Sequence, residues 1–266
     1  MNFKRAYAVY LRYLFIMRGN PQRFFNIFVW AIMDIVLWGF ITKYFNALGG
    51  PAFNLVTTLM GAVILWAFLV RAQQGVSTPA LEDTWTHNHI NYFASPLSVG
   101  EYTLGLVFSS VITSLIGLVF VAVLAGLLFG VNVLILGFSL LPFLLILFLF
   151  GIALGIMAIA LILRFGPSAE WIIWPIPALI EPFCGVLYPV SVLPGWMQAI
   201  SKVLPPTYVF AGMRALLTGG QFSVQELVAG FVLSIAFLLL AYVLFEYIFR
   251  YAVRYGLIAR FGAEGS

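Results

Sequence analysis

Residues 181–214 read EPFCGVLYPVSVLPGWMQAISKVLPPTYVFAGMR, an apolar stretch interrupted by five prolines. Because proline lacks a backbone donor and its ring clashes with the preceding turn, a single straight helix cannot run through this stretch. Within a membrane, interrupted backbone is tolerated only where protein or a water-lined cavity covers it. We therefore expect a helix that approaches the outer surface of the membrane, breaks, and dips back through short helical pieces.

The composition of the whole chain is that of a membrane-embedded protein. Of its 266 residues, 63% are apolar and 8% are charged, and the mean hydropathy is +1.08. Soluble domains carry about 25% charged residues, so a soluble globular domain is excluded. The net charge of +4 comes mainly from residues expected to flank the spans, and it indicates topology and not nucleic-acid binding. The single cysteine, Cys184, excludes an intramolecular disulfide framework and any all-cysteine metal site.

The hydropathy pattern predicts an all-α polytopic membrane protein with six transmembrane helices. The uncharged run Tyr102–Leu163 would be about 93 Å long as a helix, enough for two crossings of a ~30 Å hydrocarbon layer and a turn. The six predicted spans are Phe24–Tyr44, Phe53–Arg71, Glu101–Phe129, Val133–Leu163, Glu170–Tyr188 and Leu227–Tyr247.

Turn and capping residues separate these spans. Gly49-Gly50-Pro51 lies between the first and second spans, and Gly130-Val131-Asn132 lies between the third and fourth. Before the sixth span, a Gly219-Gly220 stop is followed by Ser223 and Glu226 at capping-box spacing.

Lysine and arginine are distributed unequally between the two sides that these spans define. Lys43, Lys202 and Arg214 fall on one side. The other side holds Lys4, Arg5, Arg12, Arg18, Arg23, Arg71, Arg164, Arg250, Arg254 and Arg260. The positive-inside bias then places both termini and the even-numbered loops in the cytoplasm, with the chain in the inner (plasma) membrane.

Residues 1–20 are predicted to form an amphipathic interface helix. On a helical wheel, Lys4, Arg5, Arg12 and Arg18 fall within an arc of about 140°, and aromatic and aliphatic residues cover most of the opposite side. Such a helix lies in the headgroup plane of the membrane. By itself the pattern is equally that of a simple topological anchor.

The proline-rich segment resembles the fifth span and re-entrant hairpin of the permease subunits of type-2 ABC exporters. The elements that carry the resemblance follow in the family's order: Gly185, Tyr188-Pro189, Leu193-Pro194-Gly195-Trp196, Leu204-Pro205-Pro206 and Gly212-Met213-Arg214. The resemblance implies one transmembrane domain over residues 1–266. Its parts would be an interface helix at 1–20, spans one to five at 24–188, a re-entrant segment at 189–222, and the sixth span with a cytoplasmic tail at 227–266.

The resemblance also implies partners. Two permease copies, as a homodimer in membrane lipid, would pair with two copies of a separate P-loop ATPase, and the interface helix would transmit motor movement to the bundle. This chain carries no G-x-x-x-x-G-K-[ST], because none of Lys4, Lys43 and Lys202 follows a glycine. We expect ATP and Mg to bind to the partner, and no cofactor, metal site or catalytic residue in this chain.

The polar segment 71–98 reads RAQQGVSTPALEDTWTHNHINYFASPLS, and it is predicted to contain a short helix. Thr78 could cap this helix, with Pro79 at its first position and Ser95-Pro96 after its end. By resemblance, it would be the coupling helix that docks on the ATPase. The candidate contacts are Glu82, Asp83, Trp85, His87 and Asn88. The alternative is an ordinary solvated loop.

Two carboxylates are predicted near the membrane midplane. Asp34 and Glu181 lie ten or eleven residues from the cytoplasmic start of their spans, or roughly 15 Å deep. A carboxylate there costs about 2.5 kcal/mol or more, so both should face the bundle interior, a partner or water. We place them on the translocation path, with Phe183 and Tyr188 as candidate aromatic lining. Alternatively, each is a protonated acid bonded to a neighbouring helix.

The sequence thus predicts the transmembrane subunit of an ATP-driven exporter for an amphiphilic or hydrophobic substrate. A drug, a lipid and a lipid-linked glycan all fit. An ion- or proton-coupled secondary transporter is the alternative, although no inverted repeat is visible. A membrane-embedded enzyme would need ligating or nucleophilic residues that we do not find.

Overall fold

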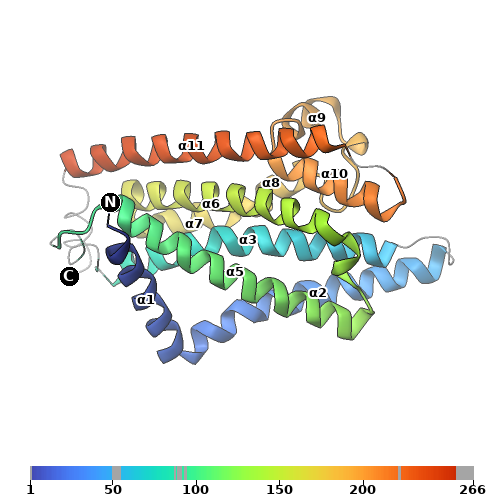
Figure 1. The fold of residues 1–266 in the computed structure, drawn as a ribbon, viewed down its shortest axis with the longest axis horizontal. Helices are drawn as coiled ribbons and strands as arrows, with labels where there is room; N and C mark the ends of the chain where they lie inside the picture. The colour runs from blue at the N-terminus through green and yellow to red at the C-terminus, as the bar shows by residue number, and fades with distance from the viewer. Residues whose placement is uncertain are drawn as a thin grey trace.

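A computed structural model describes residues 2–49, 55–86, 88, 92, 95–220 and 223–255. Within these ranges the chain is helical, without strands, and five of its helices are long and apolar enough to cross a membrane. They lie side by side in a bundle (Figure 1). These helices are α2 (Pro21–Gly49), α3 (Leu55–Trp85), α5 (Val99–Phe129), α6 (Leu140–Phe165) and α11 (Val224–Arg254). The predicted all-α polytopic membrane fold is confirmed.

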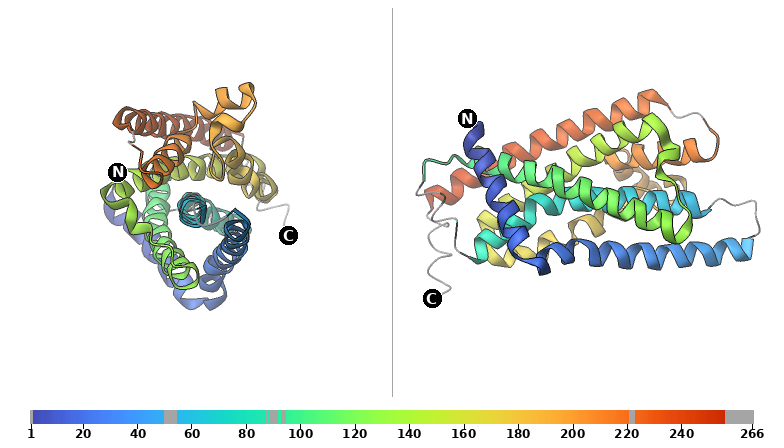
Figure 2. Two further views of the ribbon diagram at one scale, coloured as in Figure 1. Left: turned by 90° about the vertical axis from the view of Figure 1, so that its right-hand side faces the viewer. Right: turned by 60° about the horizontal axis from the view of Figure 1, so that its bottom comes forward.

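Helices α3 and α6 form the interior of the bundle. Helix α3 packs against α2, α5 and α6, and α6 also packs against α11 (Figure 2). Gly151 and Gly155 of α6 permit this close approach, because a Cβ on Gly151 would lie 2.8 Å from the Ala72 Cβ. A Cβ on Gly155 would lie 2.7 Å from the Val76 Cβ. Small residues four apart are a common means of close helix contact in membranes.

The outward faces of the bundle carry large apolar side chains. Leu127 of α5 is 79% exposed, and Val243 of α11 is 63% exposed. In water, such faces would favour aggregation, whereas in a bilayer they contact lipid chains. The surface therefore fits the membrane class that the composition predicts.

Most helix ends lie where the sequence predicts them. Helix α5 ends at Gly130, which has a φ of 68°, and Asn132 accepts a hydrogen bond from the backbone N–H of Leu134 at 3.0 Å. The fourth span begins with a short 3-10 helix, η1 (Val133–Ser139), which leads into α6. Gly49 is the last residue of α2, and Gly50 and Pro51 of the predicted turn lie outside the described residues.

The predicted capping box before the last span is wrong in one respect. Ser223 occupies the N-cap position of α11, but its side chain makes no capping hydrogen bond. A full capping box is found instead at the start of α5. There the Ser98 side chain accepts from the Glu101 backbone N–H, and the Glu101 carboxylate accepts from the Ser98 backbone N–H.

The second span is much longer than predicted. Helix α3 continues past Arg71 to Trp85 with Pro79 inside it, so the separate short helix capped by Thr78 is not formed. Tertiary packing outweighs the hydrogen bond that Pro79 cannot donate. Fully buried residues share one face of the helix on both sides of the proline, and they are Leu69, Ala72, Val76 and Ala80.

The fifth span is not one continuous helix. Residues 170–183 form three short pieces: α7 (Glu170–Ile173), α8 (Pro175–Ile180) and η3 (Glu181–Phe183), preceded by η2 (Gly166–Ala169). Prolines 175, 177 and 182 each remove a backbone donor, so the break begins earlier than the sequence pattern predicts. The predicted short helical pieces then follow as η4 (Val190–Val192), α9 (Gly195–Ser201) and α10 (Pro205–Leu217).

Helix α1 (Phe3–Gly19) lies obliquely across one end of the bundle, against α5 (Figure 1). Asn2 caps its start by accepting from the Lys4 backbone N–H at 3.0 Å, and Asn20 follows its end. We call this the α1 end of the bundle and the opposite one the α10 end. The last turn of α3 and the first turn of α5 also lie at the α1 end.

Candidate functional site

A cavity of about 650 Å³ opens on the face of the bundle formed by α2, α3 and η3. We call it the central cavity. Helix α3 contributes residues that recur at helical spacing, namely Val63, Trp66, Ala67, Val70, Arg71 and Gln74. Trp30, Ala31, Asp34 and Trp38 line it from α2, one or two turns apart, and Glu181 lines it from η3. The cavity is thus built on the second span and the break in the fifth.

The structure brings the two predicted midplane acids together in this cavity. Asp34 from α2 and Glu181 from η3 line the same cavity. Neither forms an ion pair with a lysine or arginine in the described part of the chain. Asp34 is exposed on the face of the single copy and Glu181 is half-buried. Two carboxylates at membrane depth without a cationic partner among the described residues are costly, which favours a functional role.

A second cavity of about 630 Å³ continues from the central cavity toward the α1 end. We call it the α1-side cavity, and the two together the groove. They share Trp30, Arg71 and Gln74. The remaining lining of the α1-side cavity comes from α1, α3, α5 and the junction of α7 with α8, and it consists of Tyr13, Met17, Gly75, Thr78, Glu82, Thr113 and Trp174. The groove therefore runs along one face of α3 from Val63 to Glu82.

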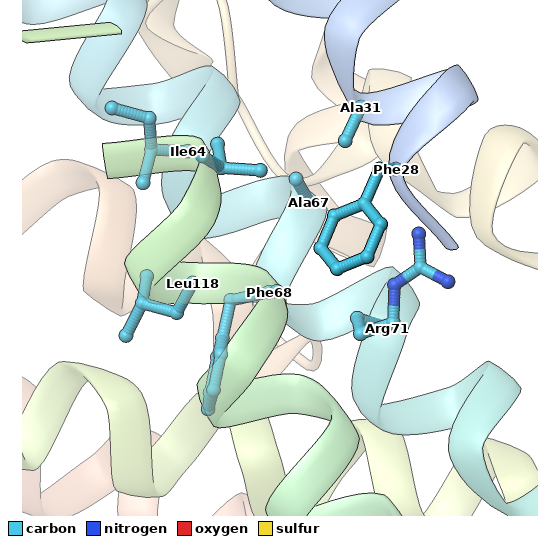
Figure 3. A pocket seen from close by; sticks show the side chains of 9 residues that line it. Phe28, Ala31, Ile64, Ala67, Phe68, Arg71 and Leu118 are labelled. Atoms are coloured by element: carbon cyan, nitrogen blue, oxygen red, sulfur yellow. The ribbon is translucent and has the colours of Figure 1, made fainter. Parts of the chain in front are cut away.

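Arg71 lies where three cavities meet. Besides the groove, it lines a smaller cavity of about 280 Å³ between α2, α3 and α5. Figure 3 shows Arg71 from α3 and Phe28 from α2 pointing into this smaller cavity. The chain makes room for the arginine at Gly117 of α5, where a Cβ would lie 3.3 Å from the Arg71 Cγ. Arg71 is therefore a groove residue in the middle of α3 and not a marker of a helix end.

Tryptophan supplies most of the aromatic surface of the groove. Trp30, Trp38, Trp66 and Trp174 line it, and they are four of the seven tryptophans in the chain. Phe183 and Tyr188, the aromatic residues predicted for the path, are not among the residues that line the three cavities. The Phe183 ring instead lies 6.2 Å from that of Trp196, and their part in transport stays a prediction.

The broken end of the fifth span, residues 182–186, is held by hydrogen bonds from side chains to its backbone carbonyls. Arg214 donates to the carbonyls of Gly185 at 2.6 Å and Val186 at 3.3 Å. Tyr188 donates to the carbonyl of Pro182 at 2.9 Å, and Ser201 donates to that of Phe183 at 2.6 Å. These contacts satisfy carbonyls that no helix satisfies.

The predicted ATPase-contact residues occupy different environments at the α1 end. Asp83 is only 5% exposed and forms an ion pair of 2.9 Å with Arg12. Glu82 lines the groove, whereas Trp85 is 46% exposed at the end of α3. Asn88 follows α3 and donates its backbone N–H to the Asp83 carbonyl. His87 lies outside the described residues.

Sequence reasoning missed Arg71, Gln74 and the groove tryptophans as site residues. The pattern that could have found Trp66 and Gln74 is the recurrence of Trp66, Val70, Gln74 and Thr78 at intervals of four along α3. This pattern becomes visible only if the helix is extended past Arg71 to Thr78. Ending the span at Arg71 therefore concealed half of the groove.

Comparisons with known proteins agree with this architecture. A search of curated proteins found no match. The family model described as ABC-2 type transporter matches residues 6–218, a region that begins in α1 and ends just after α10, so it includes the groove and the re-entrant segment. Because the match covers most of the chain, this protein belongs to the family of ABC-2 type transporters and is the transmembrane permease component of such a transporter.

Proposed function

We propose that this permease exports an amphiphilic or hydrophobic substrate, and that the groove is its translocation path. A drug, a lipid and a lipid-linked glycan all remain within this class. The observation that carries the proposal is the groove itself, which joins a central cavity with two carboxylates to an α1-side cavity through Arg71. An apolar wall rich in indole rings can follow an acyl chain or stack on a sugar.

A second copy of the chain would complete the path. Asp34 is exposed and Trp30 is 65% exposed on the single copy, at a depth where lipid would otherwise contact a carboxylate. Placing another copy against this face would bury both and bring α3 and the α7–η3 segment of the two copies opposite each other. We therefore propose a homodimer with the path at its interface.

The proposed orientation places the α1 end in the cytoplasm of the cell and the α10 end outside. The positive-inside bias supports it, because nine of the basic residues assigned to the cytoplasm still lie in α1, near span ends or in the tail once Arg71 is moved to the groove. In this orientation the end of α3, with Trp85 and Asn88, faces the cytoplasm, where it would contact an ATPase subunit. The homodimer would bind two copies of the ATPase. Hydrolysis of ATP, with Mg, would take place on those subunits.

The test is to look for a P-loop ATPase in a neighbouring reading frame and to reconstitute the permease with it. We expect co-purification, and hydrolysis in lipid nanodiscs that amphiphilic compounds stimulate. Inside-out vesicles should then take up the stimulating compound when ATP is added. No ATPase association, together with uptake driven by a pH gradient alone, would overturn the proposal. That result would favour a proton-coupled transporter, for which the pair Asp34 and Glu181 is the supporting observation.

A further inference from the structure

Helix α1 lies at the surface of the bundle and also forms one wall of the groove. Tyr13 and Met17, one helical turn apart, line the α1-side cavity opposite Gln74, Thr78 and Glu82 of α3. Met17 is 9% exposed, so its side chain is enclosed and does not face lipid or headgroups. The width of the groove at the α1 end therefore depends on the distance between α1 and α3.

The first half of α1 is fastened to α5. The Asn2 backbone N–H donates to the Glu101 carboxylate at 2.6 Å, and Arg5 lies 3.7 Å from the same carboxylate. Gly105 allows contact between the helices, because a Cβ there would lie 2.6 Å from the Ala6 carbonyl oxygen. This half of α1 cannot move away from α5 without breaking these contacts.

A network around the buried Asp83 carboxylate joins the middle of α1 to α3. Arg12 forms its 2.9 Å ion pair with Asp83, and the Tyr102 hydroxyl donates to the other carboxylate oxygen at 2.9 Å. The Arg12 guanidinium also lies 5.0 Å from the centre of the Tyr92 ring. Asp83 therefore receives hydrogen bonds from α1 and α5 at once, and it ties three helices together at the point where α1 becomes the groove wall.

We propose that Arg12, Asp83 and Tyr102 form a latch that holds the groove wall of α1 against α3. Arg12 directly precedes Tyr13, so release of the latch frees the segment that narrows the groove while the first half of α1 stays on α5. Asp83 is then a positioning residue for the groove and not a docking contact for the ATPase. The proposal rests on the proposed function only in taking the groove as the substrate path.

The experiment measures the α1–α3 distance by cross-linking. In a Cys184→Ala background, which has no other cysteine, Met17→Cys and Thr78→Cys place thiols on the two walls of the α1-side cavity. A short bifunctional thiol reagent should join them in the assembled transporter. Adding Asp83→Asn should lower the cross-linking rate about tenfold, because the carboxylate charge that binds Arg12 is lost while the side-chain shape remains.

The controls separate the latch from general damage. Arg12→Asp with Asp83→Arg restores opposite charges and should recover the cross-linking rate. Glu246→Gln removes an exposed ion pair of 2.6 Å with Arg250 on α11 and should leave the rate unchanged. ATPase co-purification should persist in Asp83→Asn, which a docking contact would not allow. An unchanged cross-linking rate in Asp83→Asn, or loss of ATPase binding at a normal rate, would overturn the latch.

The same samples distinguish the latch from the wider proposal. If Asp83→Asn changes the cross-linking rate and also substrate-stimulated hydrolysis, both the latch and the groove as a path are supported. If the rate changes and transport does not, the latch is supported and the groove is not the substrate path.

Discussion

At the scale of single residues, the charges in the groove are its most unusual feature. Asp34 and Glu181 come from distant parts of the chain and meet in an apolar cavity without a lysine or arginine paired to either, as far as the described residues show. Keeping two such groups there costs folding free energy, which is expected only where the groups serve a function. We expect this function to be transport.

Amide replacement tests this expectation. Asp34→Asn and Glu181→Gln should each lower substrate-stimulated hydrolysis several-fold and leave ATPase association intact, because shape is kept while the charge is removed. The matched control is Glu226→Gln, an exposed acid in the first turn of α11. Normal transport by both groove variants would show that the two acids are structural only.

Arg214 of α10 holds the broken end of the fifth span. Arg214→Gln removes a charged donor from two carbonyls, Gly185 and Val186, and should lower the free energy of unfolding by about 1.5–3 kcal/mol. Thermal unfolding in detergent measures the effect. Arg254→Gln, at an exposed position at the end of α11, should leave the midpoint unchanged. Equal midpoints for the two variants would contradict the role of Arg214 as a clasp.

At the scale of elements, α3 shows best what the sequence can and cannot predict. Local rules placed a cap at Thr78 and a helix start at Pro79, because such residues favour those positions in isolated segments. The buried face from Leu69 to Ala80 contacts α5 and α6, which are distant in sequence, and this tertiary contact keeps the helix continuous through the proline. No window of local sequence contains that information.

The turn at Gly130 and the interruption of the chain at Pro182 were predictable for the opposite reason. A glycine with positive φ and the donors lost at proline are local properties, so the sequence alone identifies them. Of the candidate site, Asp34 and Glu181 were predictable because charge at membrane depth is rare. Arg71 was not, because its place in the groove depends on the length of α3.

Close packing between α3 and its neighbours gives a prediction at this scale. Gly75→Ala should destabilise the protein by about 1–3 kcal/mol, because the new Cβ would lie 2.6 Å from the Ser110 Cα and must push α5 away. Gly100→Ala in α5 meets no atom within 4 Å and should leave stability unchanged or slightly raised. Thermal unfolding of the two variants measures the difference, and a Gly75→Ala protein as stable as the unsubstituted chain would contradict this packing.

At the scale of the whole molecule, the orientation in the membrane decides the direction of transport. Lys202, just after α9, and Arg254, at the end of α11, are both exposed and lie at opposite ends of the bundle (Figure 1). In a Cys184→Ala background, Lys202→Cys should react with a membrane-impermeant thiol reagent in intact cells. Arg254→Cys should react only after permeabilisation. The reverse pattern would place the re-entrant segment in the cytoplasm.

The uninterrupted length of α3 has a mechanical consequence. Its 31 residues span about 46 Å, so the helix is longer than the hydrocarbon layer and reaches both membrane surfaces. A continuous helix of this length would move as one rigid body. Tilting it by about 10° around its midpoint would carry its two ends about 4 Å in opposite directions. One small tilt of α3 would thus widen the groove near one membrane surface and narrow it near the other.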